Sequence, residues 1–257
     1  MKRKIPWFPA AIFFFLIIAI PVHPSHAKTT GSEEVFFSAN QSYRDGRFQD
    51  AIEGYLHLIQ AGYVNGHIYY NLGNAYMRNN DLGEAVLNYE KARIRIPRDA
   101  DLNFNLRYAR DRRRDAVTPS RGFIDQTFFW LHDVTLYEVF WVFSIMNILF
   151  WAVLGLRLFV NAEWTYYFLI ILIIFWCISG ISFGLKWYQV KTDHRAVILP
   201  DEVNILAGPQ AKDTILFKLH EGAVVHHERS EGDWSLVHLP DRKRGWLPVK
   251  AIAMMKE

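Results

Sequence analysis

The chain has 257 residues, a formal net charge of +3 and one cysteine, and 51% of its residues are hydrophobic. The small net charge argues against a nucleic-acid-binding protein, and the single cysteine, Cys177, excludes an intramolecular disulfide. The hydrophobic surplus gathers in three blocks, one at the N-terminus and two within residues 136–188, which indicates membrane segments rather than one large core.

The first 27 residues have the three-part layout of a secretory signal. The start is basic at residues 2–4, an apolar run follows, and small residues stand at Ser25 and Ala27. The pattern predicts a signal peptide at 1–27 with cleavage after Ala27, and the alternative is an uncleaved anchor. In both cases we expect the chain from residue 28 onward to be exported.

Residues 32–115 repeat a pattern of small and aromatic residues. When the chain is shifted by about 34 residues, the period of a tetratricopeptide repeat, Ala85 falls on Ala51 and Tyr89 on Tyr55. Such a unit consists of two antiparallel helices that stack on the next unit. The alternative is a set of generic amphipathic helices.

The residue types suit this arrangement. Small residues at Gly73 and Ala85 allow two helix backbones to approach closely, and Pro97 ends the second helix of its unit. The region resembles tetratricopeptide repeats, which implies an all-α solenoid. We expect one unit at 32–65, a second at 66–99, and a capping helix at 100–115.

Polar residues recur within the repeats. Arginines share one repeat position, and asparagines share the position one helical turn earlier. In tetratricopeptide proteins these positions line the concave face, so the resemblance implies a site for an acidic segment or a peptide C-terminus. The alternative is a solvated helix face. The candidate protein-binding residues are Asn40, Arg44, Asn74, Arg78 and Arg112.

A linker and interfacial segment at 116–135 precedes two apolar runs within 136–188. Each run has the roughly 20 residues needed to cross a bilayer, and Trp164 and Trp187 lie near run ends, as interfacial aromatics do. The short connection predicts a transmembrane hairpin whose two flanking parts share one side. Export of the N-terminus places both outside the cytoplasm, whereas the basic stretch at 107–115 favours the opposite orientation.

Residues 194–254 alternate β-branched and polar residues between turn signals, which predicts short strands. The elements VNILAGP, LHEGAVV and GWLPVKAI resemble a bacterial SH3-like domain. The resemblance implies a small all-β barrel of about five strands, anchored by Trp234 and Trp246. Such domains bind cell-wall peptides or proteins, and the alternative is a domain that only packs against the rest of the chain. Leu206 stands where an arginine is common in the family.

Motifs of catalysis are missing from the sequence. It contains no phosphate-binding loop, no nucleophile elbow and no zinc-binding HExxH helix. The densest group of potential ligands, His226 to Glu228, lies in a strand-like run where neighbours face opposite ways. We therefore expect no catalytic residue, no metal site and no cofactor, and a protein that is not an enzyme.

The order of these parts resembles the BatE-type proteins of the Bacteroides aerotolerance group. The resemblance implies a multi-domain membrane protein that acts as a non-catalytic scaffold, with both soluble modules on the periplasmic side of the bacterial inner membrane. It also implies von Willebrand A-domain membrane proteins and a MoxR-type ATPase as partners in stress tolerance. One alternative is a cell-wall sensor that binds peptidoglycan through the SH3-like domain. Another is an enzyme accessory subunit or a cryptic hydrolase.

Overall fold

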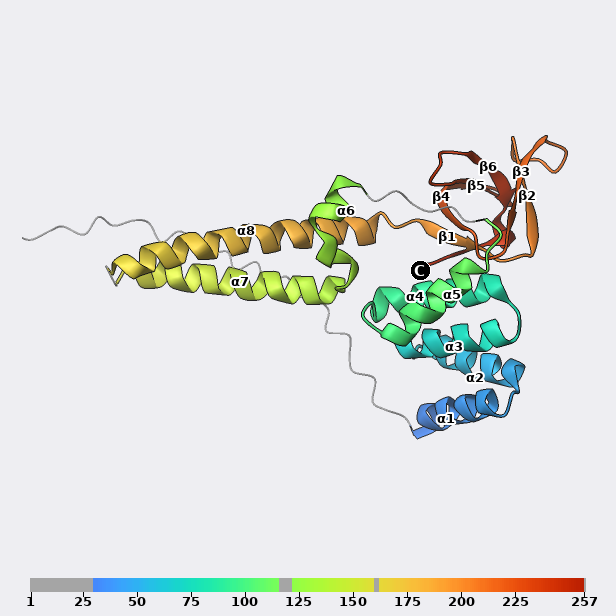
Figure 1. Ribbon diagram of the computed structural model, residues 1–257, viewed down its shortest axis with the longest axis horizontal. Coiled ribbons are helices and arrows are strands. Elements are labelled where there is room, and N and C mark those ends of the chain that lie inside the picture. Colours follow the sequence, from blue (N-terminus) through green and yellow to red (C-terminus); the bar gives the residue numbers. More distant parts are fainter. Residues whose placement is uncertain (1–29, 116–121, 160–161, 257) are drawn as a thin grey trace, which may run out of the picture.

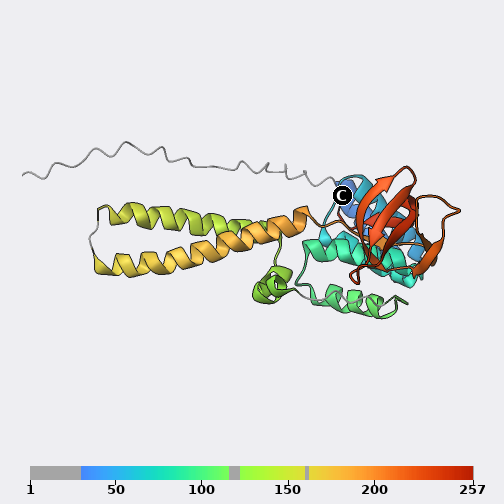
Figure 2. The same ribbon diagram turned by 90° about the horizontal axis from the view of Figure 1, so that it is seen from above.

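The computed structural model describes residues 30–115, 122–159 and 162–256 (Figure 1). A helical N-terminal part and a C-terminal β-sheet domain lie side by side, and a long pair of helices extends away from them (Figures 1 and 2). The predicted signal peptide at 1–27 and the beginning of the linker, 116–121, lie outside the described residues.

Within the described residues, the N-terminal part consists of five helices joined by short turns. Each helix packs on the next along the chain, so the helices form a stack (Figure 1). The helices are α1 (Thr30–Arg44), α2 (Phe48–Gln60), α3 (Gly66–Arg78), α4 (Leu82–Arg95) and α5 (Ala100–Asp111).

Small side chains set the spacing between α3 and α4. A Cβ atom on Gly73 would lie 2.7 Å from the ring of Tyr89, so only glycine fits against this ring. Ala85 is fully buried in the same contact region. The turn between the helices has Asn80 in the left-handed region with φ 65°. Helix α4 ends just before Pro97, as proline's missing N–H and restricted backbone require.

Two of the described helices are long and apolar enough to cross a membrane, judged by length and composition. They pack against each other as a hairpin (Figures 1 and 2). Only 6% of the most apolar stretch of one and 22% of the other is buried, so their apolar side chains remain uncovered by protein. Two short helices precede the hairpin. The elements are α6 (Phe123–Thr127), the 3₁₀-helix η1 (Phe129–His132), α7 (Leu136–Arg157) and α8 (Glu163–Lys191).

The described C-terminal part forms an antiparallel sheet of seven strands in the order β3-β2-β6-β5-β4-β1-β7. The described sheet has more strands than the expected number of about five, because β3 was not recognised as a separate strand and the element GWLPVKAI, expected as one strand, contains both β6 and the first residue of β7. The strands are β1 (Arg195–Ile198), β2 (Glu202–Leu206), β3 (Ile215–His220), β4 (Val224–Glu231), β5 (Trp234–His238), β6 (Arg244–Pro248) and β7 (Ile252–Met254).

The helical part and the sheet domain share a hydrophobic core. Val86 of α4 and Leu102 and Leu106 of α5 belong to the same buried cluster as Val197 of β1 and Met255. A second cluster fills the inside of the curved sheet. The two parts expected as separate modules therefore form one packed body at the end of the hairpin (Figure 1).

Candidate interaction surfaces

Asn40 holds its own helix pair together. The Tyr55 hydroxyl donates a hydrogen bond of 2.6 Å to Oδ1 of Asn40, and Asn71 Nδ2 donates one of 3.2 Å to the same oxygen. Tyr55 is 1% exposed, and burial is the main cause that raises its pKa to about 12. The amide oxygen of Asn40 thus satisfies a buried hydroxyl, which would otherwise destabilise the fold.

Asn74 repeats these contacts one unit later. Tyr89 donates its hydroxyl hydrogen to Asn74 Oδ1 over 2.8 Å, and Asn105 Nδ2 donates to the same atom over 2.9 Å. Asn40 and Asn74 therefore position helices, a role that the sequence interpretation missed. Tyrosines recurring at the interval of the asparagines, at Tyr55 and Tyr89, were the signal that points to it.

The three predicted arginines lie at corresponding ends of helices. Arg44 and Arg78 are the last residues of α1 and α3, and Arg112 directly follows α5. All three are exposed, and among the described residues none of them forms an ion pair with a carboxylate. Because helix C-termini carry partial negative charge, each arginine also stabilises its helix. The structure thus places three exposed guanidinium groups without carboxylate partners at corresponding helix ends.

Each of these arginines has a local contact instead. Arg44 Nη2 donates to Gln41 Oε1 over 2.8 Å. Arg78 lies over the ring of Phe48, with its guanidinium carbon 4.9 Å from the ring centre. Arg112 lies in the same way over Tyr108 at 4.8 Å. Arg78 therefore packs on Phe48, and its side chain is not surrounded by solvent alone. No hydrogen bond or ion pair joins any two of the five predicted residues in the part of the chain that the structure describes.

The sheet domain has a small apolar cluster that is separate from its main core. Leu206 lies opposite Trp246 in the strand register, and Trp246 lies opposite Leu236. All three side chains are at most 7% exposed, and the partly buried Trp234 packs against them. The guanidinium carbon of Arg229 lies 5.4 Å from the centre of the Trp246 ring. Leu206, which stands where an arginine is common in the family, is therefore part of the packing of this cluster.

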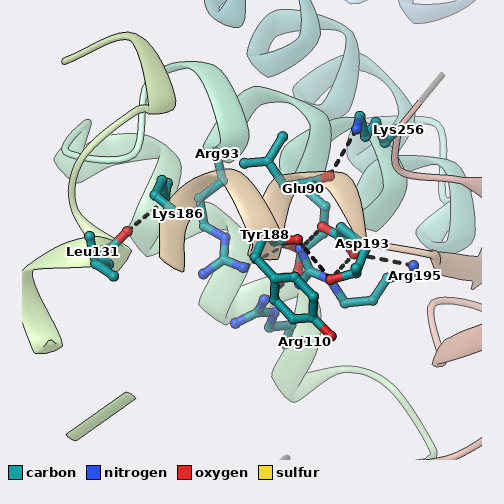
Figure 3. A network of polar contacts seen from close by, with 11 residues as sticks. Glu90, Arg93, Arg110, Leu131, Lys186, Tyr188, Asp193, Arg195 and Lys256 are labelled. Carbon is teal, nitrogen blue, oxygen red and sulfur yellow. Dashed lines mark hydrogen bonds and ion pairs between the residues drawn. The ribbon is translucent and has the colours of Figure 1, made fainter. Parts of the chain in front are cut away.

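A network of charges joins the helical stack to the sheet domain (Figure 3). Glu90 of α4 has a side chain that is 1% exposed, and it pairs with Arg93 at 3.0 Å and with Arg110 of α5. Burial by itself would raise the pKa of Glu90, but the charges of Arg93, Arg110 and Arg195 together hold it at about 2. A buried carboxylate with this many cationic partners stays ionised and fixes its neighbours.

The end of α8 and both ends of the sheet domain meet at this network. Arg195 Nη2 binds Asp193 at 2.7 Å, and the backbone N–H of Met255 donates to the Arg195 carbonyl. Lys256 Nζ donates to the Val190 carbonyl over 2.8 Å. Figure 3 shows these side chains converging from α4, α5, α8 and β1. The hairpin therefore continues into the shared body through a region held by charged contacts.

A second contact between the two parts lies at the other end of α4. Glu221 Oε2 accepts the backbone N–H of Leu82 over 3.1 Å and that of Gly83 over 3.3 Å, which caps α4 from the sheet domain. A Cβ atom on Gly83 would lie 2.7 Å from the Leu199 carbonyl oxygen. The backbones at Gly83 and Leu199 therefore lie so close together that only glycine fits at position 83.

The histidine group on β4 does not gather at one point. His226 stacks on His238 with ring centres 4.9 Å apart, whereas His227 Nε2 lies 2.9 Å from Ser230 Oγ. Among the residues that the structure describes, no group of three metal-ligating side chains is found.

Residues 200–252 match the family model of the bacterial SH3 domain. No curated protein matches the chain. The matched segment spans β2 to β6, whereas β1 lies before it. The C-terminal part is thus a bacterial SH3-type domain, and β1, which lies before the matched segment, contributes both to the core of this domain and to the core shared with the helical stack.

Proposed function

We propose that the protein is a non-catalytic, membrane-anchored scaffold that presents two protein-binding surfaces on one rigid body. The observation that carries this proposal is the shared core between the helical stack and the SH3-type domain, placed at the end of an uncovered apolar hairpin. Fixed geometry between two surfaces allows two partners to be held in a defined relation. The proposal includes no enzymatic role and no cofactor.

We assign the helical stack to the tetratricopeptide class and its partner-binding edge to the three arginines. The contacts made by Asn40 and Asn74 recur at an offset of 34 residues (74 − 40), which supports a repeated unit. The exposed guanidinium groups suit an acidic segment or a carboxylate, since arginine binds carboxylates bidentately.

The resemblance to BatE-type proteins supplies candidate partners. In this proposal von Willebrand A-domain membrane proteins bind the stack, and a MoxR-type ATPase acts in the same complex during aerotolerance or envelope stress. Both soluble modules would lie on the periplasmic side of the inner membrane, after export directed by residues 1–27.

Photo-crosslinking in intact cells tests the binding edge. A crosslinking amino acid replaces Tyr108, which is 48% exposed beside Arg112, and the control replaces the exposed Glu53 on α2. We expect a von Willebrand A-domain protein to be captured at position 108 only. The combined change Arg44→Ala and Arg78→Ala should reduce capture by about tenfold or more, since each charge-assisted hydrogen bond contributes roughly 1.5–3 kcal/mol. Undiminished capture by this variant would overturn the assignment.

A reporter that is active only outside the cytoplasm tests the orientation. Fused after Glu257 it should be active, and inserted near Asn161, in the connection between the two apolar helices, it should be inactive. The reverse pattern would place both modules in the cytoplasm, as the basic stretch at 107–115 favours.

The match to the bacterial SH3 domain also favours a second candidate, cell-wall binding. Full-length protein in detergent, sedimented with purified peptidoglycan, distinguishes it from the scaffold. Co-sedimentation that is lost when Trp234 is replaced by alanine supports cell-wall binding. Protein that stays in solution supports the scaffold alone.

A further inference from the structure

An open cleft of about 480 Å³ lies where the helical stack meets the start of the hairpin. The turn between α4 and α5, residues 95–99, and the first turn of α7, residues 135–138, both line it, together with His67 of α3. Its volume falls within the roughly 300–1,000 Å³ that is usual for small-ligand sites. Neither predicted interaction surface includes this cleft.

The placement of the cleft relative to the lipid bilayer depends on the proposed membrane anchoring. It opens beside the first turn of α7, where the uncovered apolar surface of the hairpin begins. Tyr137 at this end of α7 is 62% exposed, and Trp187 and Tyr188 at the neighbouring end of α8 are 49% and 63% exposed. Exposed aromatic residues at helix ends lie at the level of lipid headgroups. In a membrane the cleft would therefore face headgroups directly.

The charged residues of the cleft balance each other. Arg95 and Arg98 contribute two positive charges, and Asp99 and Glu138 contribute two negative charges. Arg98 already pairs with Glu138 across the cleft, which shows that the two walls are within reach of each other. A site with equal numbers of both charges favours a zwitterion over a purely anionic or cationic ligand.

The carboxylates have only part of their capacity occupied. Oδ1 of Asp99 accepts the N–H of Leu102 over 2.8 Å, which leaves Oδ2 of Asp99 to accept further bonds. Glu138 Oε2 accepts the N–H of Thr135 over 2.8 Å and its hydroxyl over 3.0 Å as part of a capping box, and Oε1 of Glu138 accepts Arg98 Nη2, which leaves Oε1 one further acceptor position. Both carboxylates line the cleft and are held in place by backbone groups.

We propose that this cleft binds the headgroup of a zwitterionic phospholipid with a primary ammonium group, of the phosphatidylethanolamine class. Arg95 Nη1 already donates to the Lys91 carbonyl over 3.0 Å and Arg98 Nη2 pairs with Glu138, so the remaining N–H groups of these two arginines bind the phosphate oxygens. The ammonium group donates to Asp99 and Glu138. A quaternary ammonium carries no N–H to donate, and a headgroup without an amine leaves Oδ2 of Asp99 and the remaining acceptor position of Glu138 unused. The acyl chains then follow α7 past Tyr137.

Native mass spectrometry of the full-length protein tests the proposal. The protein, in detergent, is titrated with phosphatidylethanolamine, phosphatidylcholine and phosphatidylglycerol, and bound lipids are counted. We expect phosphatidylethanolamine to be retained about tenfold better than the other two, as one charge-assisted contact predicts. Equal retention of the three lipids by the unaltered protein would overturn the proposal.

Two paired variants test the two halves of the site. The change Arg95→Gln with Arg98→Gln should abolish the retention of phosphatidylethanolamine. The change Asp99→Asn with Glu138→Gln keeps both helix caps, since Asn and Gln also accept backbone hydrogen bonds, and should shift the preference to phosphatidylglycerol. Arg47→Gln, at an exposed arginine on the turn between α1 and α2, is the control and should change nothing. Retention that neither paired variant alters would assign lipid binding elsewhere.

Alkaline carbonate extraction of vesicles separates this proposal from the membrane anchoring on which it rests. If the unaltered protein is released from the vesicles, both proposals fail. If it stays inserted and shows no preference among the three headgroups, the headgroup site fails and the anchored scaffold stands.

Discussion

The C-terminal ends of α1, α3 and α5 use charged residues in one way, and the contacts along α4 use them in the opposite way. At the edge formed by α1, α3 and α5, the guanidinium groups are exposed and lack carboxylate partners among the described residues. Along α4, the carboxylate of Glu90 is buried between two arginines, and Glu221 caps the helix from another part of the chain. The comparison shows that buried and paired charged residues stabilise the fold, whereas exposed charged residues can bind a partner.

The largest expected effect on stability comes from Glu90, in the charged network where the helical stack meets the sheet domain. Replacing Glu90 with Gln leaves Arg93 and Arg110 without their common anion and should lower the free energy of unfolding by about 3 kcal/mol at neutral pH. Chemical denaturation in detergent measures this loss. The exposed Glu34→Gln on α1 is the control and should have no measurable effect. A loss as small as that of the control would mean that the junction does not depend on this carboxylate.

The same residue gives a pH dependence with a defined sign. The pKa of Glu90 is lowered from 4.5 to about 2, so its stabilising contribution is fully present above pH 4.5 and is lost as the pH falls toward about 2. The unfolding free energy of the unaltered protein should therefore fall across this window more steeply than that of Glu90→Gln. Parallel curves for the two proteins would contradict the lowered pKa.

The asparagines should behave as structural residues. Replacing Asn74 with Ala removes the acceptor of the buried Tyr89 hydroxyl, which should cost about 1–3 kcal/mol of unfolding free energy. Asn40→Ala should cost a similar amount through Tyr55. Adding Tyr89→Phe to Asn74→Ala removes the unsatisfied hydroxyl and should restore part of the loss. A double variant that is weaker still would show that Asn74 acts through another contact.

The cap on α4 should have a smaller effect. Replacing Glu221 with Ala should destabilise the contact between the stack and the sheet domain by about 1 kcal/mol. Hydrogen exchange at the amides of Leu82 and Gly83, which donate to Glu221, should speed up more than elsewhere in α4. Glu221→Gln retains an acceptor and should recover much of the protection. Unchanged exchange in Glu221→Ala would show that other contacts hold this helix end.

The smallest expected effect on folding is at the arginine edge. The combined change Arg44→Ala and Arg78→Ala removes the stacking of Arg78 on Phe48 and a favourable charge at two helix ends, which together should cost less than about 1 kcal/mol. Thermal unfolding measures it. A loss of unfolding free energy equal to that of Glu90→Gln would mean that these arginines, too, mainly stabilise the fold.

Local sequence patterns determine much of this protein. The helix periodicity, Gly73 beside Tyr89, the stop before Pro97, the two apolar helices and the SH3-type domain all follow from short-range properties such as side-chain size, backbone freedom and run length. These properties act within one helix, one strand or one pair of neighbouring helices, so the order of residues along the chain is enough to predict them.

Only the tertiary structure decided how the parts meet. The sequence by itself does not show that Glu90 finds Arg110, that Glu221 caps a helix about 140 positions earlier in the chain (221 − 82 = 139), or that β1 joins the core of the stack. It also assigned Asn40 and Asn74 to a binding face, whereas buried hydroxyl groups engage both. Contacts between distant segments depend on which surfaces become buried together, and that outcome is set by the packing of the whole body.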